Sequence, residues 1–496
     1  MRMQRYLAAF DQGTTGSTVL LCALDGRILA KVNVEIPAYY PQPGWVEHEP
    51  ESWWSSSLEA LKQAQAEANV QPEGCCAVGV TNQRETTALW SRADGKPLGR
   101  AIVWQDRRTA PQCEALRSRG FEALLRERAG LVVDPYFSGT KLAWLLRENG
   151  LHARAAAGEI AFGTVDAFMV HKLTAGARHV TDPSNASRTM LYNIHTRSWD
   201  SDLAAALDVP MALLPDVVPS SGSMGVTKGV PGLPDGTPIT GMAGDQNAAL
   251  FGQGCFDPGA AKCTYGTGAF LIKNVGPQPK PSEHRLLSTI AWQVGDEVTY
   301  ALEGSAFVAG AAVQWLRDAL GIISESAEVE ALAREVESSD GVVFVPALAG
   351  LGSPHWQPDA RGIIAGLTRG STKAHIARAT LEGIAWQIVD LCSAIEADAG
   401  VPLATLRVDG GASENNLLLQ IQADCLGKVV ERPRNIETTA LGAVYLAGLG
   451  AGVWSHVDEL RALNPVDTTF EPTGDAAPRR AALERWHEAV SRTAPL

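Results

Sequence analysis

The chain has 496 residues, of which 45% are hydrophobic and 20% charged, and its formal net charge is −13. This length exceeds what one hydrophobic core usually organises, so the sequence predicts two large domains. The acidic balance argues against binding to nucleic acid or to an anionic membrane, because such partners are bound by basic faces. It does not exclude a nucleotide, whose phosphates can be held by backbone N–H groups and a metal ion.

Several other classes are excluded by what the sequence lacks. No apolar run is long enough to span a bilayer, and the stretch before Asp11 is too short for a secretory signal, so we expect a cytoplasmic protein. The eight cysteines include no CxxC pair and no zinc-spaced cluster, which favours buried, reduced thiols. Neither a GxxxxGK[ST] loop nor a GxGxxG turn after a strand occurs, so a phosphate site would have to be built in another way.

The first half begins with a predicted β-meander. The apolar runs 6–10 and 18–24 flank the stretch FDQGTTGS, and a third run at 27–36 follows the turn Asp25-Gly26. Strand-like runs at 75–81 and 86–90 enclose the polar segment NQRE. Between roughly 110 and 215 the pattern becomes helical, with short helices expected around LAWLLREN and VDAFMVHKL.

The second half repeats this plan. The segment AKCTYGTGAFLI at 261–272 again places a Gly/Thr turn between two strands, and another strand pair follows. We therefore predict two similarly built domains, 1–250 and 251–496, with the Gly- and Pro-rich segment 221–238 as a boundary region. A long core helix should begin after Ser371 or Thr372. Beyond it, the run 403–426 predicts a strand, a Gly-Gly turn and a helix capped by Ser413.

The two Gly/Thr hairpins are the candidates for holding phosphate. In the first, glycine permits close approach of the backbone, and Thr14 and Thr15 offer donors. Asp11 could approach a phosphate only with Mg²⁺ between them, which predicts a metal site there. Either hairpin alone is equally explained as a solvated turn. Two of them at the heads of two domains indicate one ligand bound in a cleft between the domains.

Other polar residues allow two interpretations each. Asp245, after the apolar run PITGMAG, is either a helix N-cap or a general base for a substrate hydroxyl. Arg84 and Glu85 are either a surface salt bridge or a clamp for a small polyhydroxylated ligand. Gly410 and Gly411 form either an ordinary turn or a nest against which an adenosine could lie.

Taken together, these segments resemble the FGGY carbohydrate kinases, and within them the members that phosphorylate glycerol. The resemblance runs from DQGTT to about residue 455. It includes GWVEHEP (44–50), TNQRETT (81–87), IVWQDRRT (102–109), SGTKLAW (138–144), AGDQNAALFGQ (243–253), YGTGAF (265–270), PALAGLGSPHW (346–356), GLTRG (366–370), VDGGAS (408–413) and ETTALGA (437–443). It implies an α/β protein of two ribonuclease-H-like, actin-like domains that close a deep cleft on ATP, Mg²⁺ and glycerol.

The resemblance also implies the roles of individual residues, including Asp245 as the general base. The glycerol site would be formed by Arg84, Glu85, Trp104, Tyr136, Asp245, Gln246 and Phe270. The nucleotide would be held by Thr14, Thr15, Gly16, Thr267, Gly310, Gln314, Gly411 and Asn415, and the metal by Asp11 and Asp245. A homo-oligomer, dimer or tetramer, is expected. The sequence departs from the family at Gly16 and Thr18, where many members carry serine and arginine, and at Gly236, where some carry an arginine used for inhibition by sugar bisphosphates.

Three alternatives remain open at this point. A kinase of the same family could act on a larger polyol or a ketose, although the Arg84-Glu85 pair argues against it. An actin-like or chaperone-like module could turn over ATP without any small substrate. A catalytically weak relative is the third, because a basic nucleotide contact is missing at Thr18.

Overall fold

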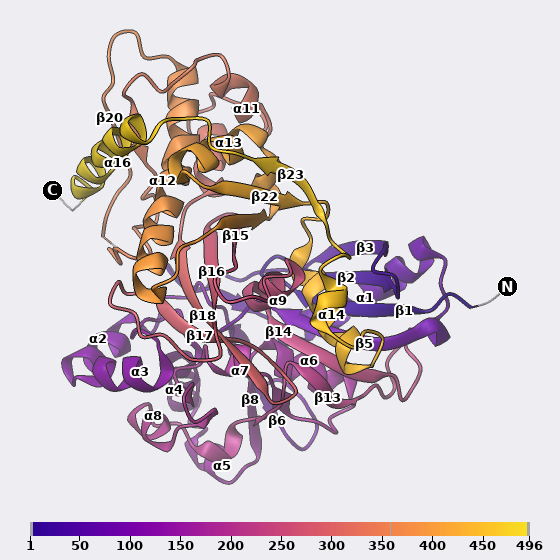
Figure 1. The fold of residues 1–496 in the computed structure, drawn as a ribbon. Helices are drawn as coiled ribbons and strands as arrows, with labels where there is room; N and C mark the ends of the chain where they lie inside the picture. The colour runs from indigo at the N-terminus through magenta and orange to yellow at the C-terminus, as the bar shows by residue number, and fades with distance from the viewer. Residues whose placement is uncertain (1–2, 358, 494–496) are drawn as a thin grey trace.

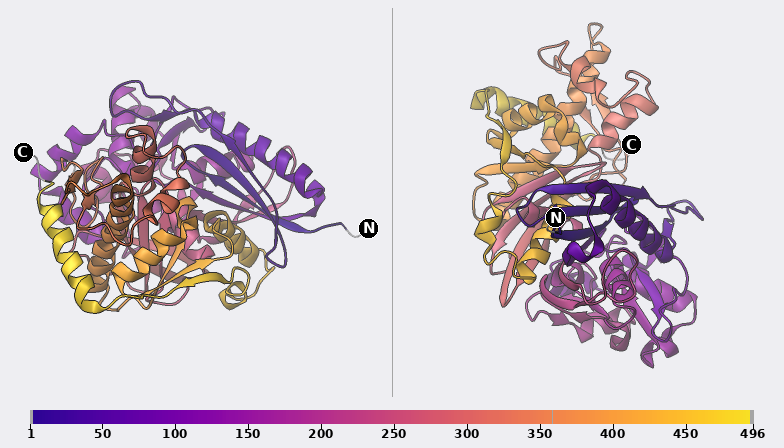
Figure 2. Two further views of the ribbon diagram at one scale, coloured as in Figure 1. Left: turned by 90° about the horizontal axis from the view of Figure 1, so that it is seen from above. Right: turned by 90° about the vertical axis from the view of Figure 1, so that its right-hand side faces the viewer.

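The computed structural model describes residues 3–357 and 359–493. Its framework is a 13-stranded sheet with the order β23-β22-β21-β15-β16-β18-β17-β13-β14-β5-β1-β2-β3. These strands are β1 (Tyr6–Gln12), β2 (Gly16–Ala23), β3 (Ile28–Glu35), β5 (Cys75–Asn82), β13 (Ser221–Val226), β14 (Pro238–Gly244), β15 (Ala261–Tyr265), β16 (Ala269–Gly276), β17 (Leu287–Val294), β18 (Glu297–Ala306), β21 (Thr405–Asp409), β22 (Val429–Pro433) and β23 (Val466–Phe470). Figures 1 and 2 show the sheet running through both halves of the molecule.

Short strands form five separate pairs, and helices surround the sheet (Figure 1). The pairs are β4 (Glu47–His48) with β7 (Ala101–Ile102), β6 (Ala88–Ser91) with β8 (Ile160–Gly163), β9 (Val180–Thr181) with β12 (Asp216–Val217), β10 (Tyr192–Asn193) with β11 (Ser198–Trp199), and β19 (Val343–Val345) with β20 (Ile363–Ala365). The helices are α1 (Pro50–Ala68), α2 (Ala110–Ser118), α3 (Phe121–Ala129), α4 (Ser138–Glu148), α5 (His152–Ala156), α6 (Val165–Leu173), α7 (Pro183–Ala186), α8 (Ser201–Ala206), α9 (Asp245–Gly252), α10 (Gly310–Asp318), α11 (Glu328–Ala333), α12 (Lys373–Ala399), α13 (Asn416–Leu426), α14 (Thr438–Gly450), α15 (Val457–Leu460) and α16 (Ala476–Ser491).

The two halves of the sheet share one pairing pattern. In the first half, β1 pairs antiparallel with β2 and β2 with β3, whereas β5 runs parallel to β1 and to β14. In the second half, β15 pairs antiparallel with β16 and β16 with β18, whereas β21 runs parallel to β15 and to β22. The prediction of two similarly built halves, each starting with a Gly/Thr hairpin, is therefore confirmed.

Two of the contacts between the halves position the sheet and its helices. A single bridge between Ser221 of β13 and Val294 of β17 joins the two parts of the sheet. Helix α14, although it comes late in the chain, packs on β1, β5 and β14 and against α9. The contact between these helices is very close, because Gly252 and Gly442 bring their bare backbones against Thr438 and Ala248. This packing fixes α9, and with it Asp245, relative to the sheet.

Several local predictions can be compared with the structure. The long helix α12 begins after Thr372, whose side chain forms a capping box with His375, as expected. Ser413 was predicted to cap the next helix, and this is wrong. The N-cap of α13 is Asn415, which accepts a hydrogen bond from the Leu418 N–H at 2.9 Å, because a 3₁₀ turn over Gly411–Glu414 delays the helix.

The segment 221–238, predicted as a boundary region, is part of the sheet at both of its ends. Its first residues form β13 and its last residue begins β14, so it belongs to the sheet at the junction of the two halves. The division of the chain at residue 250 stays a prediction. All eight cysteines are free, six of them buried, as expected. Within residues 3–357 and 359–493, no helix is both long and apolar enough to cross a bilayer.

Candidate active site

The site is built where three neighbouring parallel strands of the first half end. Gln12 of β1 lies opposite Asn82 of β5, and Asn82 lies opposite Gly244 of β14. The sheet therefore brings the residues next to these positions to one edge. They include Asp11, Arg84 and Asp245. The carboxyl ends of parallel strands are where α/β proteins generally bind ligands.

Arg84 is fixed by carboxylates. Its Nη1 and Nη2 donate to Glu303 Oε2 and Oε1 at 2.6 and 2.8 Å, and its Nε lies 3.2 Å from Asp245 Oδ1. Arg84 is buried, as is its neighbour Glu85, so the interpretation of these two residues as a surface salt bridge is wrong. A bidentate arginine–carboxylate pair sets the orientation of the guanidinium as well as its position.

A second arginine completes the buried network. Arg188 Nε donates to Glu85 Oε1 at 2.6 Å, and its Nη2 donates to Glu303 Oε1 at 3.1 Å. Sequence reasoning missed both Arg188 and Glu303. A charged residue inside the apolar strand VTYALEGSA was the available signal for Glu303, since a buried carboxylate needs a partner.

The carboxylates of this network differ in pKa and in exposure. Burial disfavours the charge of Glu303, but Arg188 and Arg84 outweigh it and lower the pKa to about 2. Burial raises the pKa of Asp245, and the Arg84 charge opposes this rise only in part. Asp245 also keeps 31% of its side chain exposed, whereas Glu303 has none. Asp245 is thus the accessible carboxylate with increased basicity, which is what a general base requires.

Asp245 is not a helix N-cap. The helix α9 begins at Asp245 itself, the N-cap is Gly244, and the Asp245 carboxylate accepts the N–H of the next residue, Gln246, at 2.7 Å. The structural interpretation of this aspartate is therefore wrong. One oxygen of the Asp245 carboxylate contacts Arg84, and this carboxylate is the partly exposed member of the otherwise buried network.

Three aromatic side chains lie together beside the network. The Trp104 ring contacts Tyr136 and Phe270 edge-on, with centroid distances of 5.6 and 6.5 Å. Phe270 comes from β16, so this cluster combines residues of both halves of the chain. Trp104 Nε1 donates to Thr14 Oγ1 at 2.9 Å and thereby connects the aromatic cluster to the first Gly/Thr hairpin. Apolar walls beside fixed polar groups are typical of small-molecule sites.

Gln246 is buried and tied to a residue that the sequence did not indicate. Lys262 Nζ donates to Gln246 Oε1 at 2.5 Å and to Thr264 Oγ1 at 2.6 Å. Burial lowers the pKa of Lys262, while Asp409 and Asp245 oppose that effect. The amide oxygen of Gln246 therefore already accepts one hydrogen bond, which fixes the orientation of the side chain.

The second hairpin carries the predicted nucleotide residues of the second half. The Gly310 N–H donates to the Gly266 carbonyl at 2.9 Å, and the Ala311 N–H donates to the Thr267 carbonyl at 3.0 Å. A Cβ at Gly310 would lie 2.6 Å from the Gly266 oxygen, so glycine is required for this close approach. Thr267 and Gly310 are thus brought together, and Gln314 is exposed one turn further along α10.

The Gly-Gly turn lies against the same hairpin. Gly410 has φ +83° and approaches the Tyr265 carbonyl, where a Cβ would lie 2.6 Å away. Gly411 faces open space, since a Cβ built there would meet no atom within 4 Å. Asn415 follows one short turn later, with its side-chain oxygen used as the cap of α13. Bare backbone facing open space beside a Gly/Thr hairpin is compatible with a ligand lying against it.

The first hairpin places Thr14 and Thr15 between β1 and β2, and Gly16 is the first residue of β2. A Cβ at Gly16 would lie 2.8 Å from the side-chain amide of Asn33, which itself donates to Thr18 Oγ1 at 2.9 Å. The two positions that depart from the family are therefore packed around one asparagine. On the next strand, Lys31 pairs with Glu437 and offsets part of the negative charge near Asp11.

Asp11 and Asp245 form the candidate metal site. Burial raises the pKa of Asp11 to about 8, with further contributions from Asp245 and Glu437. Within the described residues, no group of three or more His, Cys, Asp or Glu could hold a metal ion. Two hard oxygen donors nevertheless fit Mg²⁺, which commonly binds one or two carboxylates and completes its shell with water and substrate phosphates.

Comparisons with known proteins agree with this geometry. Residues 6–252 match the model of the N-terminal domain of the FGGY family of carbohydrate kinases, and residues 261–451 match that of its C-terminal domain. The chain is 51% identical to a glycerol kinase of Myxococcus xanthus over 495 residues, covering 99% of this chain and 100% of that protein.

Two solved structures show the same fold. The crystal structure of Plasmodium falciparum glycerol kinase with ADP has a TM-score of 0.93 and 32% identity, covering 100% of this chain and 99% of that one. A gluconate kinase from Lactobacillus acidophilus, at 21% identity, has a TM-score of 0.87, covering 99% and 97%. The expected two-domain, ribonuclease-H-like sugar-kinase architecture is thereby confirmed. With both family models matched along most of its length, the chain belongs to the FGGY family of carbohydrate kinases.

Proposed function

We propose that this protein transfers the terminal phosphoryl group of ATP to glycerol and releases sn-glycerol 3-phosphate and ADP. The proposal is supported by full-length similarity to proteins named glycerol kinase. The observation that carries it is the accessible Asp245 carboxylate held 3.2 Å from Arg84, which Glu303 fixes in turn. A small polyol needs this combination of oriented donors, acceptors and one basic carboxylate.

In the proposed complex, Arg84 and Glu85 orient the hydroxyls of glycerol, together with Tyr136 and Gln246. Trp104 and Phe270 pack against the carbon chain. Asp245 accepts the proton of the attacking glycerol hydroxyl. The oxygen of that hydroxyl bonds to the γ-phosphorus while the bond between the γ-phosphorus and the leaving ADP breaks. Transfer of this kind depends mainly on positioning and electrostatics. The buried arginine–glutamate network would contribute by fixing the position of Arg84 beside Asp245.

The nucleotide would be held between the halves. Thr14, Thr15 and Gly16 of one hairpin and Thr267 of the other would receive the phosphates. The remaining nucleotide contacts would come from Gly310, Gln314, Gly411 and Asn415. Mg²⁺, held by Asp11 and Asp245 directly or through water, would neutralise charge on the phosphates. A cytoplasmic homo-oligomer, dimer or tetramer, is part of this proposal and is checked by sedimentation of the purified protein and by cell fractionation.

A coupled assay of ADP release with Mg·ATP and a panel of polyols tests the proposal. We expect the highest kcat/KM with glycerol, and much lower values with erythritol and xylulose, because the aromatic cluster restricts the length of the carbon chain. A preference for xylulose or erythritol would identify a kinase for a larger polyol or ketose. ADP release that no polyol increases would favour a nucleotide-driven binding module.

A further inference from the structure

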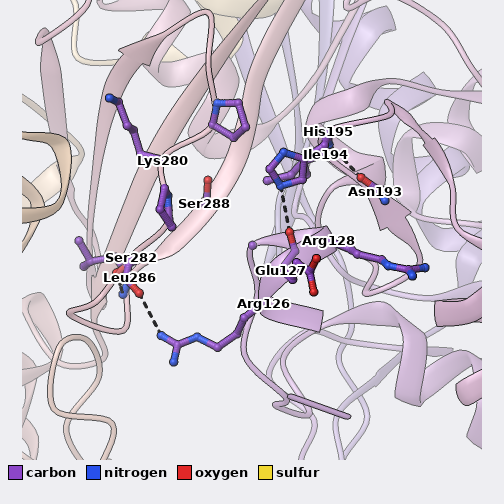
Figure 3. A pocket seen from close by; sticks show the side chains of 13 residues that line it. Arg126, Glu127, Arg128, Asn193, Ile194, His195, Lys280, Ser282, Leu286 and Ser288 are labelled. Carbon is purple, nitrogen blue, oxygen red and sulfur yellow. Dashed lines mark hydrogen bonds between the residues drawn. The ribbon is translucent and has the colours of Figure 1, made fainter. Parts of the chain in front are cut away.

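A cavity lies between the two halves, beside the strand next to β18, and its lining residues Leu286 and Ser288 flank Leu287, which lies opposite Glu303. It has a volume of about 580 Å³ and is lined by residues of both halves, from α3 and the loop after β10 on one side and from residues 279–288 on the other. Figure 3 shows Arg126, Glu127 and His195 on one wall, with Lys280, Ser282 and Ser288 opposite. This volume falls in the range of sites for small organic ligands.

The walls of this cavity carry cations without carboxylate partners. Among the described residues, Arg126 makes one hydrogen bond, from Nη2 to the Ser282 carbonyl at 3.2 Å, and that bond spans the two walls. Lys280 forms neither a hydrogen bond nor an ion pair with any residue in 3–357 or 359–493. The acidic residue on the wall, Glu127, is exposed and makes no ion pair within the same ranges. In a protein of net charge −13, this local excess of positive charge is unusual.

The third cation on the wall is already neutralised. Arg128 Nη1 donates to Asp200 at 2.9 Å and to Asp202 at 2.7 Å, and it points away from the open space in Figure 3. His195 Nε2 lies 2.9 Å from the Glu127 carbonyl oxygen. Arg126 and Lys280 are therefore the cations of the lining without a carboxylate partner among the described residues, and Lys280, whose ammonium points away from Arg126 in Figure 3, would turn toward a ligand.

A buried hydroxyl between these cations lacks a partner. Ser288 is 3% exposed, and its Oγ has no hydrogen-bond partner among the described residues. Its backbone is fixed, because the Ser288 N–H donates to the Gly130 carbonyl at 2.9 Å. A buried polar atom without a partner costs free energy, and such atoms in native proteins usually mark a bound water, ion or ligand.

We propose that this cavity binds a small phosphoryl anion, such as inorganic phosphate or a phosphate monoester, through Arg126, Lys280 and Ser288. Donors from opposite walls suit a tetrahedral phosphoryl group, whose oxygens point in different directions, better than a planar carboxylate. The site spans both halves of the chain, so an occupant would bridge them. The proposal does not depend on the reaction proposed above.

Isothermal titration with inorganic phosphate and with methyl phosphate tests this site. We expect binding to the unaltered protein and a Kd about a hundredfold higher in the Arg126→Ser/Lys280→Ser variant, since each of the two lost contacts is a hydrogen bond to a charged group that changes Kd about tenfold. The matched control is Lys62→Ser/Arg119→Ser, which removes the same charge from exposed positions outside the cavity and should leave the Kd unchanged. An unchanged Kd in the first variant would overturn the proposal.

Two further variants separate this site from the catalytic hairpins and from structural effects. Thr267→Val alters the second hairpin and should leave the titrated site intact; loss of all phosphate binding there would instead place the bound anion at the hairpin. Ser288→Ala should raise the Kd about tenfold, the effect of one hydrogen bond to a charged acceptor. Without ligand, Ser288→Ala should keep the Tm or raise it slightly, because the buried hydroxyl has no partner to lose. Binding of citrate but of neither phosphate would refute the phosphoryl assignment.

Discussion

In each half of the sheet, an aspartate and a threonine lie opposite each other on the hairpin's first strand and its parallel neighbour. The two halves differ in which of these two strands carries the aspartate. In the first half Asp11 lies on β1 opposite Thr81 of β5, and in the second half Thr264 lies on β15 opposite Asp409 of β21. Asp409 is buried and accepts hydrogen bonds from Thr264, Thr438 and Gln253. The Asp11 carboxylate accepts no hydrogen bond from any residue in 3–357 or 359–493.

This difference distinguishes a carboxylate that stabilises the fold from one that is available to a ligand. A carboxylate whose lone pairs are filled by neighbouring hydroxyls and amides stabilises the fold, and nothing remains for a ligand. Asp11, by contrast, is only partly buried and lies close enough to Asp245 for the two charges to repel each other. In the proposed function, the open pair of aspartates in the first half would hold the cation and take part in the reaction, and the second half would provide a fixed surface for the nucleotide.

The largest expected effect concerns the more exposed of the open carboxylates. Asp245→Asn should lower kcat by about 10²- to 10⁴-fold, the usual contribution of a general base, because the amide cannot accept the hydroxyl proton. Steady-state assays with glycerol measure this loss, and the exposed Asp235→Asn serves as the control. Near-normal turnover in Asp245→Asn would remove this residue from the proposed role.

A substitution in the buried arginine–glutamate network should lower the stability of the protein. Glu303→Gln should reduce the free energy of unfolding by roughly 3 kcal/mol, because Arg84 and Arg188 would lose their shared buried carboxylate. Urea denaturation measures this change. Glu488→Gln, in an exposed pair with Arg492, is the control and should change stability by less than about 1 kcal/mol. Equal effects in the two variants would contradict the structural role of Glu303.

The comparison between Asp11 and Asp409 can be tested directly. Asp409→Ala should destabilise the protein by about 2 kcal/mol, since several buried donors would lose their acceptor. Asp11→Ala should leave stability unchanged or slightly higher, because it relieves repulsion with Asp245, while reducing activity and the response to Mg²⁺. Denaturation of both variants in metal-free buffer distinguishes them. A larger loss of stability in Asp11→Ala would reverse the assignment.

The smallest expected effect is a pH dependence at another satisfied carboxylate. Asp390 accepts hydrogen bonds from His355, Trp486 and His487, and the bond to Asp390 raises the pKa of His487. The stabilisation by protonated His487 is complete below the pKa of an unfolded histidine and is lost as the pH rises through the higher folded value. His487→Ala should therefore lower the Tm more at pH 6 than at pH 9. A difference that does not vary with pH would contradict the pairing.

The sequence predicted the parts of the fold that depend on local pattern. Alternating apolar residues around DQGTT and YGTG indicated both hairpins, and the helical repeat after Thr372 indicated α12. The N-cap of α13 was misplaced because Ser413 and Asn415 are both good capping residues, and only the 3₁₀ turn before the helix decides between them.

The candidate site was only partly predictable, for a physical reason. The family resemblance indicated Arg84, Glu85 and Asp245, but no local pattern connects them to Arg188 or Glu303. Arg84 and Glu303 are 219 residues apart, and their contact exists only because the sheet brings the two halves together. The boundary prediction for 221–238 depended on its glycines and prolines, and no local pattern showed that sheet pairing makes its ends β13 and β14.

The central claim is most directly tested by measuring ADP release from Mg·ATP by the purified protein with and without glycerol. We expect glycerol to increase the rate by orders of magnitude, with one molecule of glycerol 3-phosphate formed for each ADP released. A rate that is the same in the presence and absence of glycerol would contradict the proposed function.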